Sequence, residues 1–264
     1  MFTFRLIRDG FHSGAANMAR DEAISRAVSA GKQLPTLRLY GWTPPAISLG
    51  YSQRTSSVNE ARCREDGIEI VRRPTGGLAI LHTDELTYSV SLPIDHPLAE
   101  GDVMTSYRRI AEALMHALRL LGVPEVAANR VPKERRAKGP VCFEAPSDYE
   151  IVGAGKKIVG SAQWRRLDGV MQHGSLPLHG DIARICAYLW DAPAPELVHA
   201  HAATLQELLG HPTSWAEAAS AWQRGFEEAL GIHFTEATLS EEEQRCAETL
   251  IAEKYANDTW TRRR

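Results

Sequence analysis

VRRPTGGLAILH, residues 71–82, is the stretch from which both the fold and the site can be inferred. Two arginines end one apolar run, a Pro-Thr-Gly-Gly turn follows, and a second apolar run ends in a histidine. Because glycine has no Cβ, Gly76 and Gly77 let the backbone come close to a ligand, and Arg72 and Arg73 place positive charge beside that opening. The pattern suits an acyl chain or acyl phosphate lying against backbone amides. The alternative is a β-hairpin whose turn requires glycine.

Hydrophobic periodicity on both sides of this stretch predicts an α+β fold, with a mixed, mostly antiparallel sheet flanked by helices. The predicted strands are residues 2–7 (as an edge strand), 37–40, 46–51, 68–73, 78–81, 86–92 (half-buried), 149–152, 157–162 and 170–178. The predicted helices are residues 15–30 (amphipathic), 57–66 and 107–121, and two capping boxes begin at Ser214 and Ser240. Residues 123–140 are polar and rich in proline, which predicts a mobile loop.

Length and composition predict one domain, residues 1–264, with a helical C-terminal portion from about residue 181 to 264. The formal net charge of −3 implies no bulk attraction to nucleic acid or to an anionic membrane. Four widely spaced cysteines without zinc-site spacing indicate free thiols in a reducing compartment, and three of them (Cys63, Cys186 and Cys246) are expected to be small buried apolar residues. No apolar run reaches the ~18 residues of a membrane span. We therefore expect a cytoplasmic protein that has no metal site.

Cys142 is the candidate nucleophile. It lies in PVCFEAPSDYE, between the predicted loop and a predicted strand, where a substrate can reach a thiol. Lys157, in GKKIVGSAQ, follows on an apolar strand and is predicted to face inward, whereas Lys156 faces solvent. A cation beside a thiol favours the nucleophilic thiolate and can donate to an acyl carbonyl as charge develops there.

Two histidines are further candidates for the site. His82 ends the apolar run after the glycines, and it could shuttle a proton or orient the acyl group. His173, in GVMQHGSLPL, lies on a predicted strand and could line the pocket. Either one could instead have a structural role. Ser161 is rejected as a nucleophile because GSAQ is not the GxSxG elbow.

These segments together resemble the lipoate/biotin protein ligase superfamily, on its lipoate side. The similar segments are RRPTGG with its following histidine, ELTYSV, GKKIVGSAQ, QHGSLPL, LYGWTPPAISLGYSQ, ATLQELLG, GFEEALG and KYANDTW. Within the superfamily, VCFEAPSDYE resembles the cysteine segment of the Bacillus-type octanoyltransferases. The likeness spans nearly the whole chain.

The resemblance implies a catalytic core like that of biotin protein ligases and class II synthetases. It also implies that Cys142 carries the acyl group, that Lys157 is the pocket lysine, and that no cofactor is needed. The donor would be octanoyl-acyl carrier protein and the acceptor a lysine of a lipoyl domain or the glycine-cleavage H protein. The residues implied to bind substrate are Arg73, Thr75, Gly76, Gly77, His82, Gly160, Ser161 and His173.

Three other functions stay open at the level of sequence. The first is an ATP-dependent lipoate ligase, which would need no nucleophilic cysteine. Ligases of this superfamily commonly have a third glycine where this chain has Leu78, a departure that narrows the space for an adenylate. The second is transfer of octanoate from H protein to other lipoyl domains. The third is a non-catalytic module that binds lipoyl domains. The sequence leaves the oligomeric state undetermined.

Overall fold

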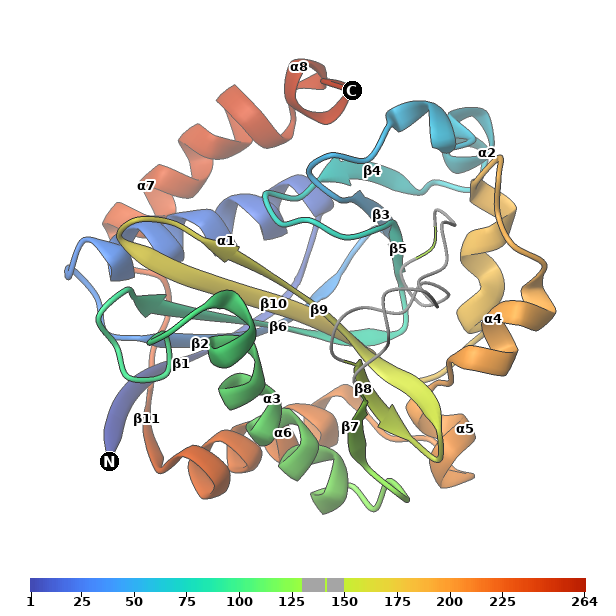
Figure 1. The fold of residues 1–264 in the computed structure, drawn as a ribbon. Coiled ribbons are helices and arrows are strands. Elements are labelled where there is room, and N and C mark those ends of the chain that lie inside the picture. Colours follow the sequence, from blue (N-terminus) through green and yellow to red (C-terminus); the bar gives the residue numbers. More distant parts are fainter. Residues whose placement is uncertain (130–140, 142–149) are drawn as a thin grey trace.

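Two β-sheets and the helices packed on them form the protein, seen in a computed structural model that describes residues 1–129, 141 and 150–264 (Figure 1). The strands are β1 (Phe2–His12), β2 (Thr36–Trp42), β3 (Ala46–Leu49), β4 (Glu69–Arg72), β5 (Ile80–His82), β6 (Glu85–Pro93), β7 (Ala127–Asn129), β8 (Glu150–Gly153), β9 (Lys156–Arg165), β10 (Gly169–Pro177) and β11 (Ile232–Glu236). The helices are α1 (Gly14–Ser29), α2 (Glu60–Glu65), α3 (Val103–Leu120), α4 (Pro195–His201), α5 (Leu205–Leu209), α6 (Trp215–Leu230), α7 (Glu241–Leu250) and α8 (Asp258–Thr261). Short 3-10 segments, η1 (Thr55–Ser57) and η3 (Ile182–Tyr188), and a π-helical segment, η4 (Ile251–Tyr255), complete the elements.

The larger sheet has the strand order β11-β1-β2-β6-β10-β9-β8-β7. β1 pairs in parallel with β11 and with β2, and the remaining neighbours in this sheet are antiparallel. The smaller sheet has the order β4-β3-β5, with β3 parallel to β4 and antiparallel to β5. The predicted α+β class with a mixed, mostly antiparallel sheet is confirmed.

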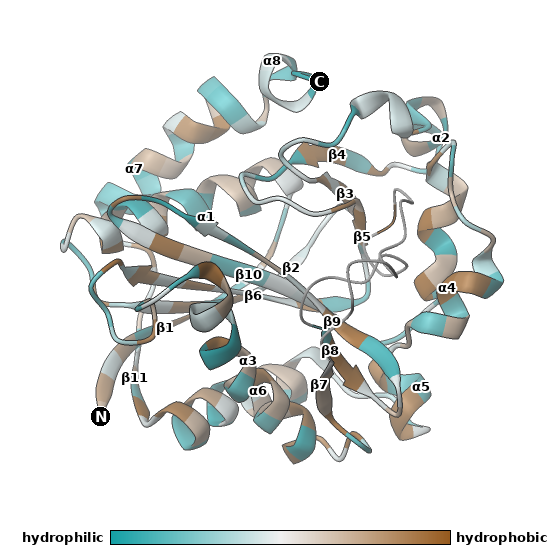
Figure 2. Ribbon diagram, viewed as in Figure 1, coloured by the Kyte–Doolittle hydropathy of each residue, from teal (hydrophilic) through white to brown (hydrophobic). Residues whose placement is uncertain are grey.

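Helices cover both faces of the larger sheet, which accounts for its buried strands. The pair α3 and α6 packs on one face, and α1 and α7 lie together on the other (Figure 1). Polar and apolar segments alternate along α3 and α6, as an amphipathic helix on a core requires (Figure 2). The main core between α3, α6 and the sheet includes Phe4, Tyr88, Leu114, Trp222 and Phe226.

Several local predictions are confirmed. The hairpin of β8 and β9 turns at Ala154 and Gly155, whose φ angles are +46° and +77°. Positive φ at both central turn positions matches the right-handed twist of the paired strands. The capping boxes at Ser214 and Ser240 begin α6 and α7.

Within the described ranges, no helix is long and apolar enough to cross a membrane.

Contacts between distant segments overturn several predictions and exclude the hairpin alternative for residues 71–82. β1 is not an edge strand, because β11 pairs with its outer side, and β11 itself lies in the portion predicted to be helical. β4 and β5 do not form a hairpin with each other, because β3 lies between them and pairs with both. β6 is buried on both faces rather than half-buried, since helices cover both faces of its sheet. Residues 127–129 of the predicted loop form β7, which pairs with β8, and residues 130–140 lie outside the described ranges.

Helix α1 also differs from its prediction as an amphipathic helix. It buries polar side chains as well as apolar ones, among them Asn17, Asp21 and Glu22. Asp21 can be buried because the guanidinium of Arg38, which is fully buried, lies 2.7 Å from its carboxylate. A paired charge of this kind avoids most of the cost of burying an isolated one. The polar face of α1 is therefore part of the interior, next to the site.

Candidate active site

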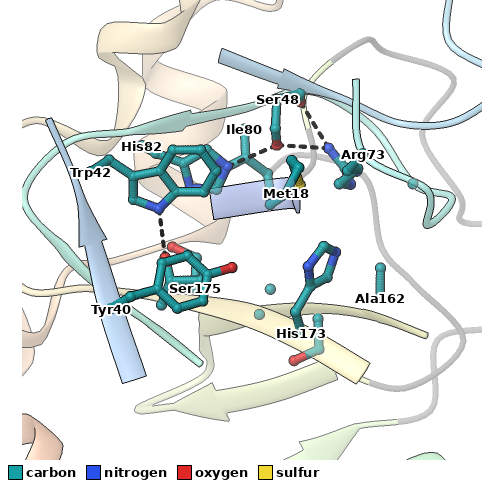
Figure 3. Close-up of a pocket in the computed structure, with 15 residues that line it drawn as sticks. Met18, Tyr40, Trp42, Ser48, Arg73, Ile80, His82, Ala162, His173 and Ser175 are labelled. Atoms are coloured by element: carbon teal, nitrogen blue, oxygen red, sulfur yellow. Dashed lines mark hydrogen bonds between the residues drawn. The ribbon is translucent and has the colours of Figure 1, made fainter. Parts of the chain in front are cut away.

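A cavity of about 40 Å³ lies where the two sheets meet (Figure 3). Its wall takes side chains from β2, β6, β9 and β10 of the larger sheet, from β3 and β5 of the smaller sheet, and from α1. The lining residues are Met18, Tyr40, Trp42, Ser48, Arg73, Gly77, Ile80, His82, Thr87, Gly160, Ser161, Ala162, His173, Gly174 and Ser175. The site therefore depends on how the two sheets are held together.

Arg73 braces the glycine turn at the cavity. Its guanidinium donates to the carbonyl oxygens of Gly76 at 2.9 Å and Leu78 at 2.7 Å. It also donates to both the carbonyl oxygen (2.8 Å) and the hydroxyl (3.0 Å) of Ser48 on β3. These contacts use both terminal nitrogens of the side chain within the protein. Of the two positive charges predicted beside the glycines, that of Arg73 is present and holds the turn. Arg72 was wrongly placed there, because its guanidinium donates instead to the carbonyls of Gly50, Gln53 and Thr261.

The turn also packs directly against the end of β3. A Cβ placed on Gly50 would lie 1.9 Å from the carbonyl oxygen of Gly77, so only glycine fits at position 50. Gly77 itself has a φ of +91°, which favours glycine as well. The next residue after Gly50, Tyr51, donates its backbone N–H to the carbonyl of Thr75 at 2.8 Å. Glycine is therefore required on both sides of this contact.

His82 lies between a carboxylate and a hydroxyl. Its Nδ1 is 2.7 Å from Oε1 of Glu85, and its Nε2 is 2.7 Å from Oγ of Ser48. Its ring stacks on the indole of Trp42, with the ring centroids 3.9 Å apart and an interplanar angle of 11° (Figure 3). Since Ser48 also accepts from Arg73, its hydroxyl hydrogen is free to donate to a neutral His82.

Glu85 stands behind this wall and is itself 4% exposed. Its carboxylate accepts hydrogen bonds from the hydroxyls of Ser175 and Thr87 as well as from His82. Thr87 in turn accepts from Nε1 of Trp42 at 2.8 Å. Burial acts to raise the pKa of Glu85, but His82 and the two hydroxyls outweigh it and hold the pKa below its usual value.

A second histidine network forms the opposite wall. Nε2 of His173 lies 2.7 Å from the hydroxyl of Thr75, and its Nδ1 lies 3.3 Å from the carboxylate of Asp21. Asp21 also accepts from Arg38 and from the hydroxyl of Tyr40. Burial lowers the pKa of His173 more than the neighbouring carboxylate raises it. The neutral ring is therefore the stable form at neutral pH.

Lys157 faces inward, as predicted, with its residue only 4% exposed. Its Nζ lies 2.9 Å from a carboxylate oxygen of Glu150 on the neighbouring strand β8. It does not line the cavity, although Gly160 and Ser161, further along the same strand, do. Lys156 points elsewhere and donates to the carbonyl of His199, so it is half-buried rather than fully exposed as predicted.

Cys142 lies outside the described residues. Val141, which precedes it in the sequence, is fully buried and forms a β-bridge with Ala79, two positions beyond Gly77. Of the other three cysteines, Cys63 is buried. Burial raises the pKa of the Cys63 thiol to about 11, whereas Cys186 and Cys246 are half-buried.

The structure brings most of the predicted binding residues to one cavity. Those that line it are Arg73, Gly77, His82, Gly160, Ser161 and His173. Thr75 contacts the cavity through His173, and Gly76 is not among the lining residues.

Sequence reasoning missed other residues of the site. Trp42 and Ser48 stand on short apolar strands without a distinguishing pattern. Asp21 and Glu85 carried no clear signal, because other charged residues stand directly beside them, Arg20 and Glu22 in one case and Asp84 in the other.

Comparison with known proteins agrees with this architecture. The family model of the lipoyl protein ligase A/B catalytic domain matches residues 13–227. Lipoate-protein ligase A, solved with bound ATP, superposes with a TM-score of 0.81 at 28% identity, covering 98% of both chains. The bipartite lipoate protein ligase of Thermoplasma acidophilum gives a TM-score of 0.81 at 28% identity, covering 99% of this chain and 97% of that one.

Curated relatives are more similar in sequence. The octanoyltransferase LipM of Symbiobacterium thermophilum is 42% identical over 272 residues, covering 99% of this chain and 98% of that protein. The octanoyltransferase LipM of Kyrpidia tusciae is 42% identical over 276 residues, covering both proteins in full. Likeness of this extent to octanoyltransferases supports an acyltransferase enzyme. With the family model matched over most of its length, the chain belongs to the lipoyl protein ligase A/B catalytic domain family.

Proposed function

We propose that the protein is an octanoyltransferase of protein lipoylation, which carries octanoate as a thioester on Cys142. The donor in this proposal is octanoyl-acyl carrier protein, and the acceptor is a lysine of a lipoyl domain or of the glycine-cleavage H protein. The observation that carries the proposal is the hydrogen bonding of the side chains that line the cavity. Although many lining residues are polar, their polar groups are hydrogen-bonded to other protein groups.

On both sides of the cavity, the polar groups of the lining side chains have hydrogen-bond partners in the protein. His82 is held by Glu85 and Ser48, and His173 is held by Asp21 and Thr75. The remaining lining hydroxyls and ring N–H groups also have protein partners; these belong to Tyr40, Trp42, Thr87, Ser161 and Ser175. A ligand in this cavity therefore meets mainly carbon surface, which suits an acyl tail. Burying that tail at ~0.8 kcal/mol per CH₂ contributes roughly 5 kcal/mol.

In the proposed first step, the Cys142 thiolate attacks the thioester carbonyl of the donor. A new C–S bond forms, the old C–S bond breaks, and the carrier leaves as its thiolate, which takes a proton from solvent. The oxyanion that develops is stabilised by Lys157 and by backbone amides of the turn at Gly76 and Gly77. The bridge between Val141 and Ala79 supports this assignment, because it joins the residue before the cysteine to the strand that follows the turn.

In the second step, the neutral ε-amine of the acceptor lysine attacks the acyl-enzyme. A C–N bond forms, the C–S bond breaks, and the cysteine sulfur leaves with the proton that the nitrogen sheds on becoming an amide. Before the attack the ammonium group of the acceptor must lose a proton, and His82 is proposed to take it, since Lys157 is held as an ammonium by Glu150. The ion pair between Lys157 and Glu150 fixes the position of the lysine ammonium group.

The direct test is the intact mass of the protein after incubation with octanoyl-acyl carrier protein. We expect the mass to rise by one octanoyl group, and the group to be lost on addition of an acceptor domain. Cys142→Ser is expected to show neither change, while Cys63→Ser, at a buried thiol away from the cavity, is the matched control and is expected to behave as wild type. A Cys142→Ser variant that transfers octanoate at the native rate would refute covalent catalysis at this residue.

A second candidate is favoured by the likeness to lipoate-protein ligase A, which was solved with ATP. In that case free octanoate, ATP and Mg²⁺ would support acylation of the acceptor, without any carrier protein. The proposed transferase requires the carrier thioester alone. Assaying the two donor systems in parallel distinguishes these activities, and Leu78 in place of a third glycine favours the thioester donor.

A further inference from the structure

Glu85 organises the acyl cavity although it does not line it. One carboxylate accepts hydrogen bonds from three side chains that do line the cavity, His82, Thr87 and Ser175. Through Thr87 it also fixes Trp42. His82 belongs to the smaller sheet, whereas the other three belong to the larger one, so Glu85 joins the two sheets behind the cavity.

The arrangement uses both oxygens of the carboxylate. Oε1 accepts from His82 and Thr87, and Oε2 accepts from Ser175. Each of these donors would otherwise lack a partner and would turn toward the cavity, because an unsatisfied buried polar group is costly. An ionised carboxylate carries no hydrogen of its own, so both of its oxygens can accept hydrogen bonds from these donors.

We propose that Glu85 is a positioning residue that makes the enzyme selective for an unsubstituted hydrocarbon tail. By turning the polar atoms of the wall away from the cavity, it leaves no hydrogen-bond partner for a hydroxyl on the distal half of an acyl chain. A hydroxylated chain would lose its hydrogen bonds to water on entry and gain none from the wall. This inference rests on the proposed octanoyl transfer.

Glu85→Gln tests the proposal with little change in volume. The amide has one acceptor oxygen, so whichever way it lies, at least one of the three donors faces an NH₂ group and loses its acceptor. With the amide oxygen at the Oε1 position, Ser175 is the side chain released. The released hydroxyl then becomes available to a ligand in the cavity.

The measurement is the rate of acyl-enzyme formation with octanoyl thioesters and with the same thioesters hydroxylated along the distal half of the chain. We expect wild type to discriminate against the hydroxylated chains by up to about 100-fold, and Glu85→Gln to reduce that ratio by about tenfold. Adding Ser175→Ala to Glu85→Gln removes the freed hydroxyl and is expected to restore most of the selectivity. A purely structural role of Glu85 predicts no such restoration.

Glu243→Gln is the matched control, because Glu243 is a buried carboxylate that pairs with Arg5, and neither residue lines the cavity. It is expected to lower stability and leave the selectivity ratio unchanged. The proposal is overturned if Glu85→Gln keeps the wild-type ratio, or if Glu243→Gln shifts it equally. Calorimetric binding of octanamide and hydroxylated octanamide to the same variants gives the same comparison without catalysis. If wild type does not transfer octanoate, these binding measurements still test whether Glu85 sets the preference for an unsubstituted chain.

Discussion

Thr75 and His173 lie 98 positions apart in the sequence, and a hydrogen bond of 2.7 Å joins their side chains. Thr75 belongs to the glycine turn and His173 to the larger sheet. The bond therefore anchors the turn to the sheet, and Asp21 on α1 holds the other ring nitrogen of the histidine. Three elements of the site meet at one imidazole.

Protonation of His173 is expected to destabilise the protein below neutral pH. Burial lowers its pKa in the folded state, whereas the unfolded chain titrates near 6.5. As the pH falls below about 6.5, the unfolded state binds a proton that the folded state resists, so stability falls until the folded pKa is reached. Each unit between the two pKa values corresponds to about 1.4 kcal/mol.

Urea unfolding at a series of pH values measures this effect. His173→Gln should flatten the fall in unfolding free energy below pH 6.5. The half-buried His96, whose pKa burial also lowers, provides the comparison variant His96→Gln. An unchanged pH slope in His173→Gln would contradict the assignment.

Gly50→Ala and Gly76→Ala are predicted to differ sharply. A methyl group at position 50 would meet the carbonyl of Gly77 at 1.9 Å, whereas one at position 76 meets no atom within 4 Å. We expect Gly50→Ala to lower stability by about 1–3 kcal/mol and to displace the turn. Gly76→Ala should fold as wild type. Thermal unfolding together with acyl-enzyme formation checks both, and equal stability of the two variants would argue against the packing described.

Lys157→Met is expected to reduce acyl transfer by about 10²–10³-fold, the usual effect of removing one donor to a developing oxyanion. Lys156→Met, at the adjacent position, removes a lysine whose Nζ contacts the carbonyl of His199, and it should retain activity. Single-turnover kinetics of both half-reactions provide the measurement. Equal losses in the two variants would mean that the inward position of Lys157 has no special role.

Cys63 is predicted to resist alkylation in the folded protein. Burial raises the pKa of its thiol to about 11, so almost no reactive thiolate is present at pH 8. Peptide mapping after treatment with iodoacetamide should find Cys63 unmodified in native protein and modified after denaturation. Rapid labelling of Cys63 in native protein would show that this helix opens readily.

Local signals in the sequence accounted for most elements of the fold. Capping boxes, glycine turns and periodicity depend on neighbours in the chain, and they correctly predicted α3, α6 and the hairpin of β8 and β9. The strand order β4-β3-β5 could not be predicted from local signals, because the position of β3 between β4 and β5 depends on contacts between distant segments. Strand β11 was missed for the same reason, since its partner β1 lies at the other end of the sequence.

Residues of the cavity wall could be singled out from the sequence where they carry a local motif, and their roles in substrate binding stay predictions. Gly77, His82 and His173, which line the cavity, were singled out by their sequence context. Glu85 and Asp21 were missed because nothing in the sequence marks them as buried, and most of the partners that allow their burial come from other strands and helices. Lys157 was singled out because it is a charged residue on an otherwise apolar strand. In the structure it forms an ion pair with Glu150.

The position of the cavity at the junction of the two sheets has a consequence for the loaded enzyme. An eight-carbon chain seated there would touch strands of both sheets and would, while attached, form part of the protein's own interior. Its removal would take apolar contacts away from both sheets. The acylated protein is therefore expected to melt at a higher temperature than the empty one, so calorimetry can follow loading and discharge without any labelled substrate.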